Sequence, residues 1–250
     1  MPEGYNARMN SVTAERLLAI NREFYNHFGK QFSASRQRLQ PGVKKILDSI
    51  QEDVSVLDLG CGNGNFLHEI SRRGHKAPLL GLDFSLPLLR NAREVSTLGV
   101  EFREIDLTKL SAFSDQLMVN SPWSIICLFA TLHHIPSNEM RLDILRTVRK
   151  LLKKDGKFIL SNWQFLNSEK LKSRIQAWDK VGINKKDLDG GDYLLDWRSG
   201  GEGLRYAHHF TAEELSALAE QAKMRVTDSF LSDGDGGNLG LYQIWSPING

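Results

Sequence analysis

Apolar residues along most of the chain fall into short continuous runs separated by segments with helical spacing. Residues 13–29 place apolar side chains on one face and predict an amphipathic helix, and Pro41 marks the start of a second, short helix. A long helix is expected to start at Ser137 and to end at Gly156. Buried strands are expected, in this order, at VSVLDLG, LLGLD, VEFRE, SIICLFA and KFILSNW. Such strands, separated by helices, predict a parallel sheet covered on both faces.

The alternation is interrupted between about residues 167 and 209 by a polar segment that contains two glycine pairs. We expect an insertion there, with one helix through Ile175 and Trp178 followed by a loop. Thr211 and Glu214 then form a capping box that starts another helix. Two last segments, MRVTDSFL and LGLYQIW, flank a glycine-rich turn and predict an antiparallel hairpin at the sheet edge. The expected fold class is α/β, a doubly wound and mostly parallel seven-stranded sheet with an antiparallel C-terminal hairpin.

A glycine-rich segment follows the first strand of this predicted sheet. In VLDLGCGNG, a buried strand runs through Gly60, Gly62 and Gly64 into a helix. Glycines at the end of a strand let the backbone turn tightly and approach a ligand closely. A glycine triplet alone is weak evidence, because several kinds of nucleotide-binding site contain one.

Three acidic residues accompany the glycines. Asp58 lies within the first strand, Asp83 ends the second and Asp106 follows the third. Because parallel strands end at the same edge of a sheet, we expect all three around one crevice. There Asp83 can accept both hydroxyls of a ribose, and Asp106 can accept the amine of an adenine. A nicotinamide-dependent dehydrogenase is the less favoured alternative. Its glycine motif would be G-x-G-x-x-G, whereas this chain has G-x-G-x-G, and Asp58 and Asp106 would have no role in it.

With these residues, the chain from about 40 to 165 resembles the class I S-adenosylmethionine-dependent methyltransferases, which have a Rossmann-like fold. The resemblance implies that S-adenosyl-L-methionine is the cofactor. It implies that Gly60 and Gly62 face the methionine part, and that Phe129 and Ala130 lie near the transferring methyl group. The further core residues expected to bind the cofactor are Asp58, Cys61, Asn63, Asp83, Phe84, Ser85, Asp106 and Leu107, with Phe84 and Leu107 enclosing the adenine.

Segments outside this core narrow the resemblance. FYNHFGKQFSASR, LHHIPSNEMR, DYLLDW and RYAHHF look like elements of the tRNA wobble-uridine methyltransferases, which esterify a carboxymethyl group on the base. The resemblance implies that Tyr25 and Arg36 lie over the cofactor. It also implies that an insertion carrying Trp197, Arg205, Tyr206 and His208 lies beside the acceptor.

The expected organisation is a single methyltransferase domain over residues 1–250. Within it, residues 1–40 would hold a lid helix, 40–165 the cofactor-binding core, 166–210 a substrate-side insertion, and 211–250 the last helix and the edge hairpin.

A carboxylate acceptor needs no general base, because it is already a nucleophile at neutral pH. The enzyme would then act by proximity and alignment, an effect that contributes about 7–11 kcal/mol. The residues expected to act on the acceptor are His133, Arg205 and His208. His133 or its neighbour His134 can orient the acceptor, take a proton from a hydroxyl acceptor, or simply pack in the loop, and these alternatives stay open. No metal site is expected, because no third ligand has suitable spacing.

The composition, with 41% hydrophobic and 25% charged residues, is that of an ordinary globular chain. The net charge of +2 allows a polyanionic partner without predicting one. Cys61 and Cys127 lie in apolar runs and indicate a reducing compartment. No segment resembles a signal peptide or a membrane span, so we expect a cytoplasmic protein without membrane contact.

Two further features leave their roles open. The helix from Ser137 carries six basic residues, which can contact RNA phosphates or form a solvated face. Aromatic residues can stack an extruded base, wall a pocket or belong to the core; they are Trp163, Trp178, Tyr193, Trp197 and Tyr206.

The expected function is methyl transfer to a carboxylate or modified uridine of tRNA. One alternative is a small-molecule acceptor, in particular a small carboxylate. Another is a catalytically silent cofactor-binding subunit that serves a partner through Leu194, Leu195 and Trp197. A small activator protein is a further expected partner.

Overall fold

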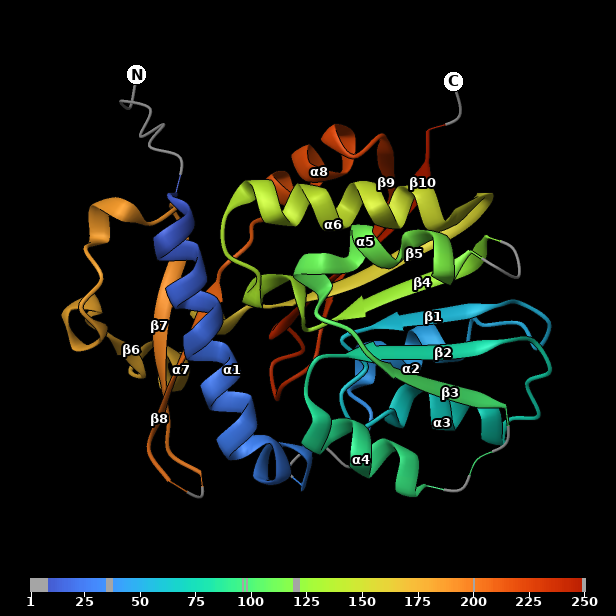
Figure 1. Cartoon of the computed structure of the whole chain (residues 1–250), viewed down its shortest axis with the longest axis horizontal. Coiled ribbons are helices and arrows are strands. Elements are labelled where there is room, and N and C mark those ends of the chain that lie inside the picture. The colour runs from blue at the N-terminus through green and yellow to red at the C-terminus, as the bar shows by residue number, and fades with distance from the viewer. Residues whose placement is uncertain are drawn as a thin grey trace.

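A computed structural model describes residues 9–34, 38–95, 97, 99–118, 122–199 and 201–248 of the chain. These residues form a seven-stranded sheet, a separate three-stranded sheet and the helices around them. A long N-terminal helix lies between the two sheets (Figure 1). None of the helices in the described ranges is long and apolar enough to cross a membrane.

The seven-stranded sheet has the strand order β3-β2-β1-β4-β5-β10-β9. Its first five strands are parallel, and β10 runs antiparallel to both β5 and β9. The order reverses between β1 and β4, the place where open α/β sheets bind their ligands. The predicted fold class is therefore confirmed. The strands are β1 (Val56–Leu59), β2 (Leu79–Asp83), β3 (Val100–Glu104), β4 (Trp123–Phe129), β5 (Leu152–Trp163), β9 (Met224–Ser232) and β10 (Gly240–Pro247).

Helices cover both faces of this sheet (Figure 1), and the parallel strands β1 and β2 are buried along their whole length. On one face the core joins the strands to α5, α6 and α8, and on the other it joins them to α2 and α3. Helix α4 lies beside β2 and β3. The bounds are α2 (Pro41–Leu47), α3 (Asn65–Arg72), α4 (Leu86–Glu94), α5 (Leu110–Leu117), α6 (Asn138–Leu151) and α8 (Ala212–Gln221).

The end of α6 differs from the prediction. The helix stops at Leu151, and β5 starts at once with Leu152, so Gly156 lies inside the strand. The register between β4 and β5 shifts close to this glycine. A Cβ at Gly156 would lie 3.1 Å from the carbonyl oxygen of Ser124, so the glycine permits close strand approach and does not end a helix.

The insertion also differs from the prediction, because it is built mainly from strands. After the short helix α7 (Glu169–Lys172), the strands β6 (Ile175–Gln176), β7 (Asp192–Trp197) and β8 (Gly203–His208) form an antiparallel sheet. The predicted helix through Ile175 and Trp178 is wrong. Ile175 pairs with Leu195 of β7, and this pairing overrides the helical spacing of the two apolar residues.

The N-terminal helix α1 (Ser11–Ala34) joins the two sheets. Leu17 of α1 packs with Tyr206 of β8, while Phe24 and Phe28 pack with Trp197 of β7 and Leu88 of α4. Helix α1 therefore holds the insertion against the edge of the large sheet where β1 and β2 end.

Candidate active site

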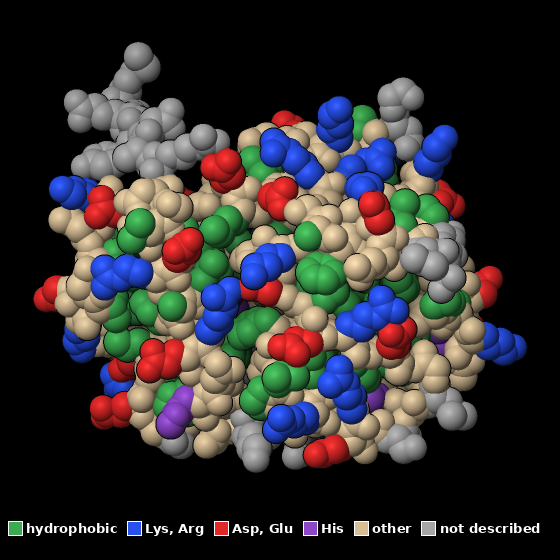
Figure 2. All heavy atoms as spheres, viewed as in Figure 1, with side chains coloured by type: hydrophobic (Ala, Val, Ile, Leu, Met, Phe, Trp, Pro, Cys, Tyr) green, Lys and Arg blue, Asp and Glu red, His purple; other side chains and the backbone are tan. Residues whose placement is uncertain are grey.

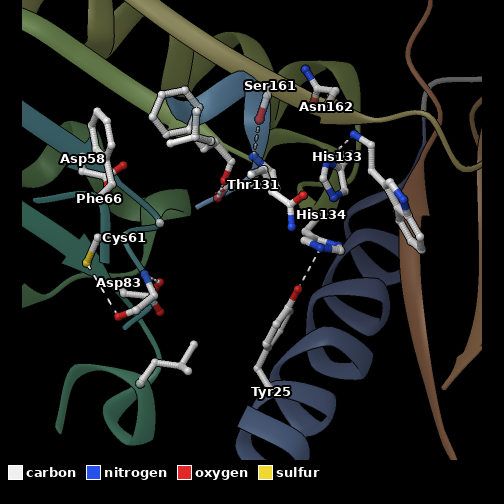
Figure 3. A pocket seen from close by; sticks show the side chains of 18 of the residues that line it. Tyr25, Asp58, Cys61, Phe66, Asp83, Thr131, His133, His134, Ser161 and Asn162 are labelled. Atoms are coloured by element: carbon white, nitrogen blue, oxygen red, sulfur yellow. Dashed lines mark hydrogen bonds between the residues drawn. The ribbon is translucent and has the colours of Figure 1, made fainter. Parts of the chain in front are cut away.

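A cavity of about 520 Å³ lies at the carboxyl ends of β1, β2, β4 and β5, with α1 and β8 as its outer walls. Figure 3 shows Asp58, Cys61 and Asp83 on one side of this space and Tyr25 with His134 on the other. The cavity brings together 14 of the 17 residues singled out from the sequence. They are Tyr25, Asp58, Gly60, Cys61, Gly62, Asn63, Asp83, Phe84, Asp106, Leu107, Phe129, Ala130, His133 and Arg205.

The glycine-rich turn after β1 has the conformation that its sequence requires. Gly60, Gly62 and Gly64 have φ values of 71°, 56° and 74°, in the left-handed region that side chains disfavour. The N–H groups of Gly60 and Cys61 both donate to the carbonyl oxygen of Leu82 at the end of β2. A Cβ at Gly60 would collide with Thr131, so the glycine also lets the β4 loop approach.

Asp83 is held at the end of β2 by backbone donors. Gly62 N–H donates to Oδ2 at 2.9 Å and Ser85 N–H donates to Oδ1 at 2.8 Å. Burial raises the pKa of Asp83. Burial and the charge of Asp83 together raise the pKa of Asp58, which is 3% exposed. Each Asp83 oxygen keeps lone pairs that can accept from a ligand hydroxyl.

Asp106 connects the core to the N-terminal helix. Thr108 donates to Oδ1 from its N–H and its hydroxyl, and Arg22 of α1 donates to Oδ2. Partial burial raises the pKa of Asp106, but the hydrogen bonds from Thr108 and the charge of Arg22 outweigh it and hold the pKa below its usual value. The ion pair links α1 to the end of β3.

At the opposite end of the cavity, β8 supplies a buried cation. Arg205 is 4% exposed, and its guanidinium lies 4.4 Å from the ring centre of Trp163. The rings of Phe24 and Trp197 are 5.5 Å and 5.6 Å away. These three aromatic rings stabilise the cation by cation–π contacts and shield it from water.

The two histidines after β4 have different surroundings. His134 contacts the carbonyl oxygen of Tyr206 through Nδ1 and the hydroxyl of Tyr25 through Nε2, both at 2.9 Å. Because the carbonyl can only accept, Nδ1 carries a proton, and in the neutral ring Nε2 accepts from Tyr25. His133 is 2% exposed, and its Nδ1 accepts from the N–H of Trp163 at 3.4 Å. His134 therefore bridges α1 and β8, and His133 packs against the end of β5.

Of the 17 residues, His208 and Ser85 are described by the structure but do not line the cavity. His208 is fully buried between two carboxylates, with Nδ1 2.7 Å from Asp192 and Nε2 2.9 Å from Glu214. His208 therefore does not line the cavity in which the other expected residues meet. Ser85 is also buried outside the cavity and supports Asp83 through its N–H. Arg36 lies outside the described residues.

His208 belongs to a buried polar network behind the cavity wall. Tyr206 donates to Asp192 at 2.8 Å and accepts from Arg141 at 2.9 Å. Arg141, 1% exposed, also donates to the carbonyl oxygen of Ile135. The network fixes β8, on which Arg205 lies, against α6 and α8.

Other cavity residues were missed in the sequence. Asn21 and Arg22 lie one turn before Tyr25 on the same side of α1, and Ser161 and Asn162 follow the apolar part of β5 near its carboxyl end. Polar residues at the end of a buried strand are the signal used for Asp83, and the same rule applied to β5 would have found Ser161 and Asn162.

Residues 27–228 match the methyltransferase domain family, and the chain belongs to this family. It is an S-adenosylmethionine-dependent methyltransferase, as the glycine motif and the strand-end acids predicted, and not a dehydrogenase.

Known proteins similar to the chain are distant. A protein of Encephalitozoon cuniculi named as a methyltransferase is 28% identical over 207 residues, 82% of this chain and 87% of that protein. The tRNA (carboxymethyluridine(34)-5-O)-methyltransferase of Mus musculus is 26% identical over 169 residues, 65% of this chain but 24% of that protein. A solved S-adenosylmethionine-dependent methyltransferase from Methanosarcina mazei has a TM-score of 0.64 at 23% identity, covers 85% of this chain and 99% of its own, and has the same fold.

The three residues expected to contact a partner protein do not lie on the surface. Leu194 and Leu195 are fully buried and Trp197 is 9% exposed, so they form no apolar docking face. In Figure 2, Lys and Arg side chains are interspersed with Asp and Glu on the face that carries α6. Helix α6 therefore does not stand out there as a uniform basic surface.

If Asp83 accepts the ribose hydroxyls of the cofactor, as the sequence predicts, replacing it by alanine is expected to weaken cofactor binding by about 1–3 kcal/mol. Isothermal titration with S-adenosylhomocysteine measures the change. A matched control is Asp48→Ala, which removes a carboxylate that pairs with Arg73 at the surface. Unchanged affinity in Asp83→Ala would place the ribose elsewhere.

Cofactor affinity is expected to fall on acidification before the ordinary carboxyl range is reached. Burial raises the pKa of Asp83, so its carboxylate form, which accepts hydroxyls, is lost as the pH falls through that raised pKa. Titrations over a pH series should therefore show weaker binding already above pH ~4, the usual aspartate pKa. Affinity that stays constant down to that pH would contradict the assignment.

Proposed function

We propose that this methyltransferase transfers the methyl group to a carboxylate oxygen of the acceptor, that of a carboxymethyl group on a tRNA wobble uridine. The observation that carries the proposal is Arg205, a buried guanidinium that lines the cavity within an aromatic enclosure. A buried arginine is suited to bind a carboxylate by two parallel hydrogen bonds.

In this proposal the cofactor lies across the strand ends with its adenine near Asp106, between Phe84 and Leu107. Its ribose hydroxyls donate to Asp83, whose position is fixed by the N–H groups of Gly62 and Ser85. The glycine turn would hold the methionine part, and Phe129 would lie beside the sulfonium. This placement leaves the end of the cavity near Trp163 and Arg205 for the acceptor.

The reaction needs no proton transfer when the acceptor is a carboxylate. The S–CH₃ bond breaks, an O–CH₃ bond forms, and a sulfonium and a carboxylate become a neutral thioether and a neutral ester. Because opposite charges cancel along the reaction, removing water from the cavity favours it. The protein's contribution is to hold oxygen, methyl carbon and sulfur in line.

The surroundings of the two histidines agree with a reaction that needs no proton transfer. His134 is engaged by Tyr25 and by the carbonyl oxygen of Tyr206, and His133 accepts from a backbone N–H. Both histidines hold parts of the cavity wall in place, and neither has to remove a proton in the proposed reaction.

The tRNA part of the proposal rests on relatives. The similar mouse enzyme acts on carboxymethyluridine 34 of tRNA according to its name. In our proposal α1 is the lid over the cofactor, because Arg22 and Tyr25 face the cavity from it, and the insertion is the acceptor side, because it supplies Arg205.

The test is methyl transfer from labelled S-adenosylmethionine to anticodon stem–loops that carry 5-carboxymethyluridine or unmodified uridine. We expect label only in the carboxymethylated RNA, and we expect mild alkali to release it, because a methyl ester hydrolyses. Label that resists alkali would indicate an N- or C-methylated product. Label in small carboxylates alone would overturn the tRNA part.

A further inference from the structure

The end of β5 holds a buried amide without a partner. Asn162 is 1% exposed and is among the residues that line the cavity. Neither its side-chain oxygen nor its side-chain nitrogen has a hydrogen-bond partner among the described residues. Figure 3 shows Asn162 near Ser161 and His133, at the end of the cavity assigned above to the acceptor.

The other buried side-chain amides among the described residues have hydrogen-bond partners. Gln164 donates to the carbonyl oxygen of Phe210, and Gln243 accepts from the indole N–H of Trp245. Asn21 accepts from the N–H of Tyr206 and donates to its carbonyl oxygen. Buried polar groups in folded proteins are generally paired, so the amide of Asn162 calls for an explanation.

The position itself suits an apolar side chain. Asn162 pairs with Leu241 of β10, and two and four residues earlier on the same side of β5 lie Leu160 and Phe158, both fully buried. A leucine at 162 would continue this pattern without leaving a donor and an acceptor unpaired. Residues that break a local rule without a compensating contact are concentrated at functional sites.

Asn162, Trp163 and Arg205 all line the same cavity, so the amide of Asn162 faces the space that holds the proposed carboxylate site. Trp163 follows it in β5, and the ring of Trp163 carries the guanidinium of Arg205 at 4.4 Å. In a base that bears a carboxymethyl group, the carboxylate would reach Arg205 and the flat ring would stack on the ring of Trp163.

We propose that Asn162 is a specificity-determining residue, whose amide hydrogen-bonds an adjacent C=O and N–H on the ring that bears the accepting carboxylate. An asparagine amide offers one acceptor and one donor side by side, which complements such an edge. The amide is buried in the ligand-free chain. It would turn toward the ring edge by rotation about χ2, a torsion that takes a broad range of values in asparagine. The inference rests on the proposed carboxylate acceptor and deepens it.

The test pairs one change in the protein with one change in the substrate. Wild type and Asn162→Leu are compared on stem–loops carrying 5-carboxymethyluridine or its N3-methyl derivative, which lacks the ring N–H. For wild type we expect kcat/KM to fall about 10- to 100-fold with the N3-methyl substrate. For Asn162→Leu we expect a similar loss on the parent substrate and no further loss on the methylated one.

Two outcomes separate failure of this inference from failure of the proposed function. If wild type does not methylate the carboxymethylated stem–loop, the proposed function fails and the inference falls with it. If wild type is active and Asn162→Leu discriminates between the two substrates as wild type does, only the role of Asn162 is overturned.

Thermal unfolding supplies a readout independent of activity, with Gln243→Leu as the matched control. Gln243 is 1% exposed in β10, does not line the cavity and has a partner. We expect Gln243→Leu to lower Tm and to leave the substrate discrimination unchanged, whereas Asn162→Leu keeps or raises Tm. If Asn162→Leu lowers Tm as much as Gln243→Leu, the amide has a structural partner and the proposal is contradicted.

Discussion

Arg205→Met is expected to lower kcat/KM for the carboxylate acceptor by about 10²–10³-fold, because truncating one member of a buried charge pair costs 2–5 kcal/mol and each 1.36 kcal/mol is tenfold in rate. The guanidinium lies over Trp163 at the end of the cavity proposed for the acceptor, whereas Asp83 and Asp106 lie at the ends of β2 and β3. Affinity for S-adenosylhomocysteine should therefore stay unchanged. Steady-state kinetics and isothermal titration measure the two effects separately.

A matched control comes from the same insertion. Arg198 pairs with Asp196, and its side chain is 60% exposed. Arg198→Met should leave both kcat/KM and cofactor affinity as they are. Arg205→Lys should recover only part of the activity, because an ammonium group cannot form the two parallel hydrogen bonds of a guanidinium. If Arg205→Met binds the cofactor normally and keeps full activity, the carboxylate is bound elsewhere.

Arg141→Met is expected to lower the free energy of unfolding by about 3–5 kcal/mol, the effect of leaving a buried charge unpaired. The guanidinium hydrogen-bonds Tyr206 and lies 3.6 Å from the carboxylate of Asp192, whose side chain is fully buried. Denaturant unfolding measures the loss. Because the same network fixes β8, the variant should also bind the acceptor less well than wild type.

A double variant tests whether the charge of Asp192 is the cause. In Arg141→Met with Asp192→Asn, the buried carboxylate 3.6 Å from Arg141 is removed together with the guanidinium, so the combined loss should be smaller than the sum of the two single losses. A loss below about 1 kcal/mol for Arg141→Met, the range of exposed ion pairs, would show that the network does not hold the insertion to the core.

The large sheet and the cofactor side of the site follow from local sequence patterns. The strands β1, β2 and β4 and the second half of β5 are mostly apolar, β3 alternates apolar and charged residues, and parallel strands end at one edge. Asp58, Asp83 and Asp106 therefore meet in one cavity although they are 25 and 23 residues apart in sequence. The positive φ of Gly60 is a local reason for glycine at this position, whereas its close approach to Thr131 arises only in the folded sheet.

The insertion could not be predicted in the same way, because its structure depends on distant partners. Ile175 pairs with Leu195, twenty residues later, and no short-range pattern specifies this register. The burial of His208 likewise depends on Asp192 and Glu214, which meet it only after β7, β8 and α8 have packed. A polar residue in an insertion can thus be structural although its sequence resembles that of a site.

The proposed placement of cofactor and acceptor is tested most directly by a crystal structure with S-adenosylhomocysteine and a 5-carboxymethyluridine oligonucleotide bound. We expect the ribose hydroxyls on Asp83, the sulfur beside Phe129, and the carboxylate between that sulfur and the guanidinium of Arg205. A ribose away from Asp83, or a sulfur that faces away from Arg205 and Trp163, would contradict the proposed direction of methyl transfer.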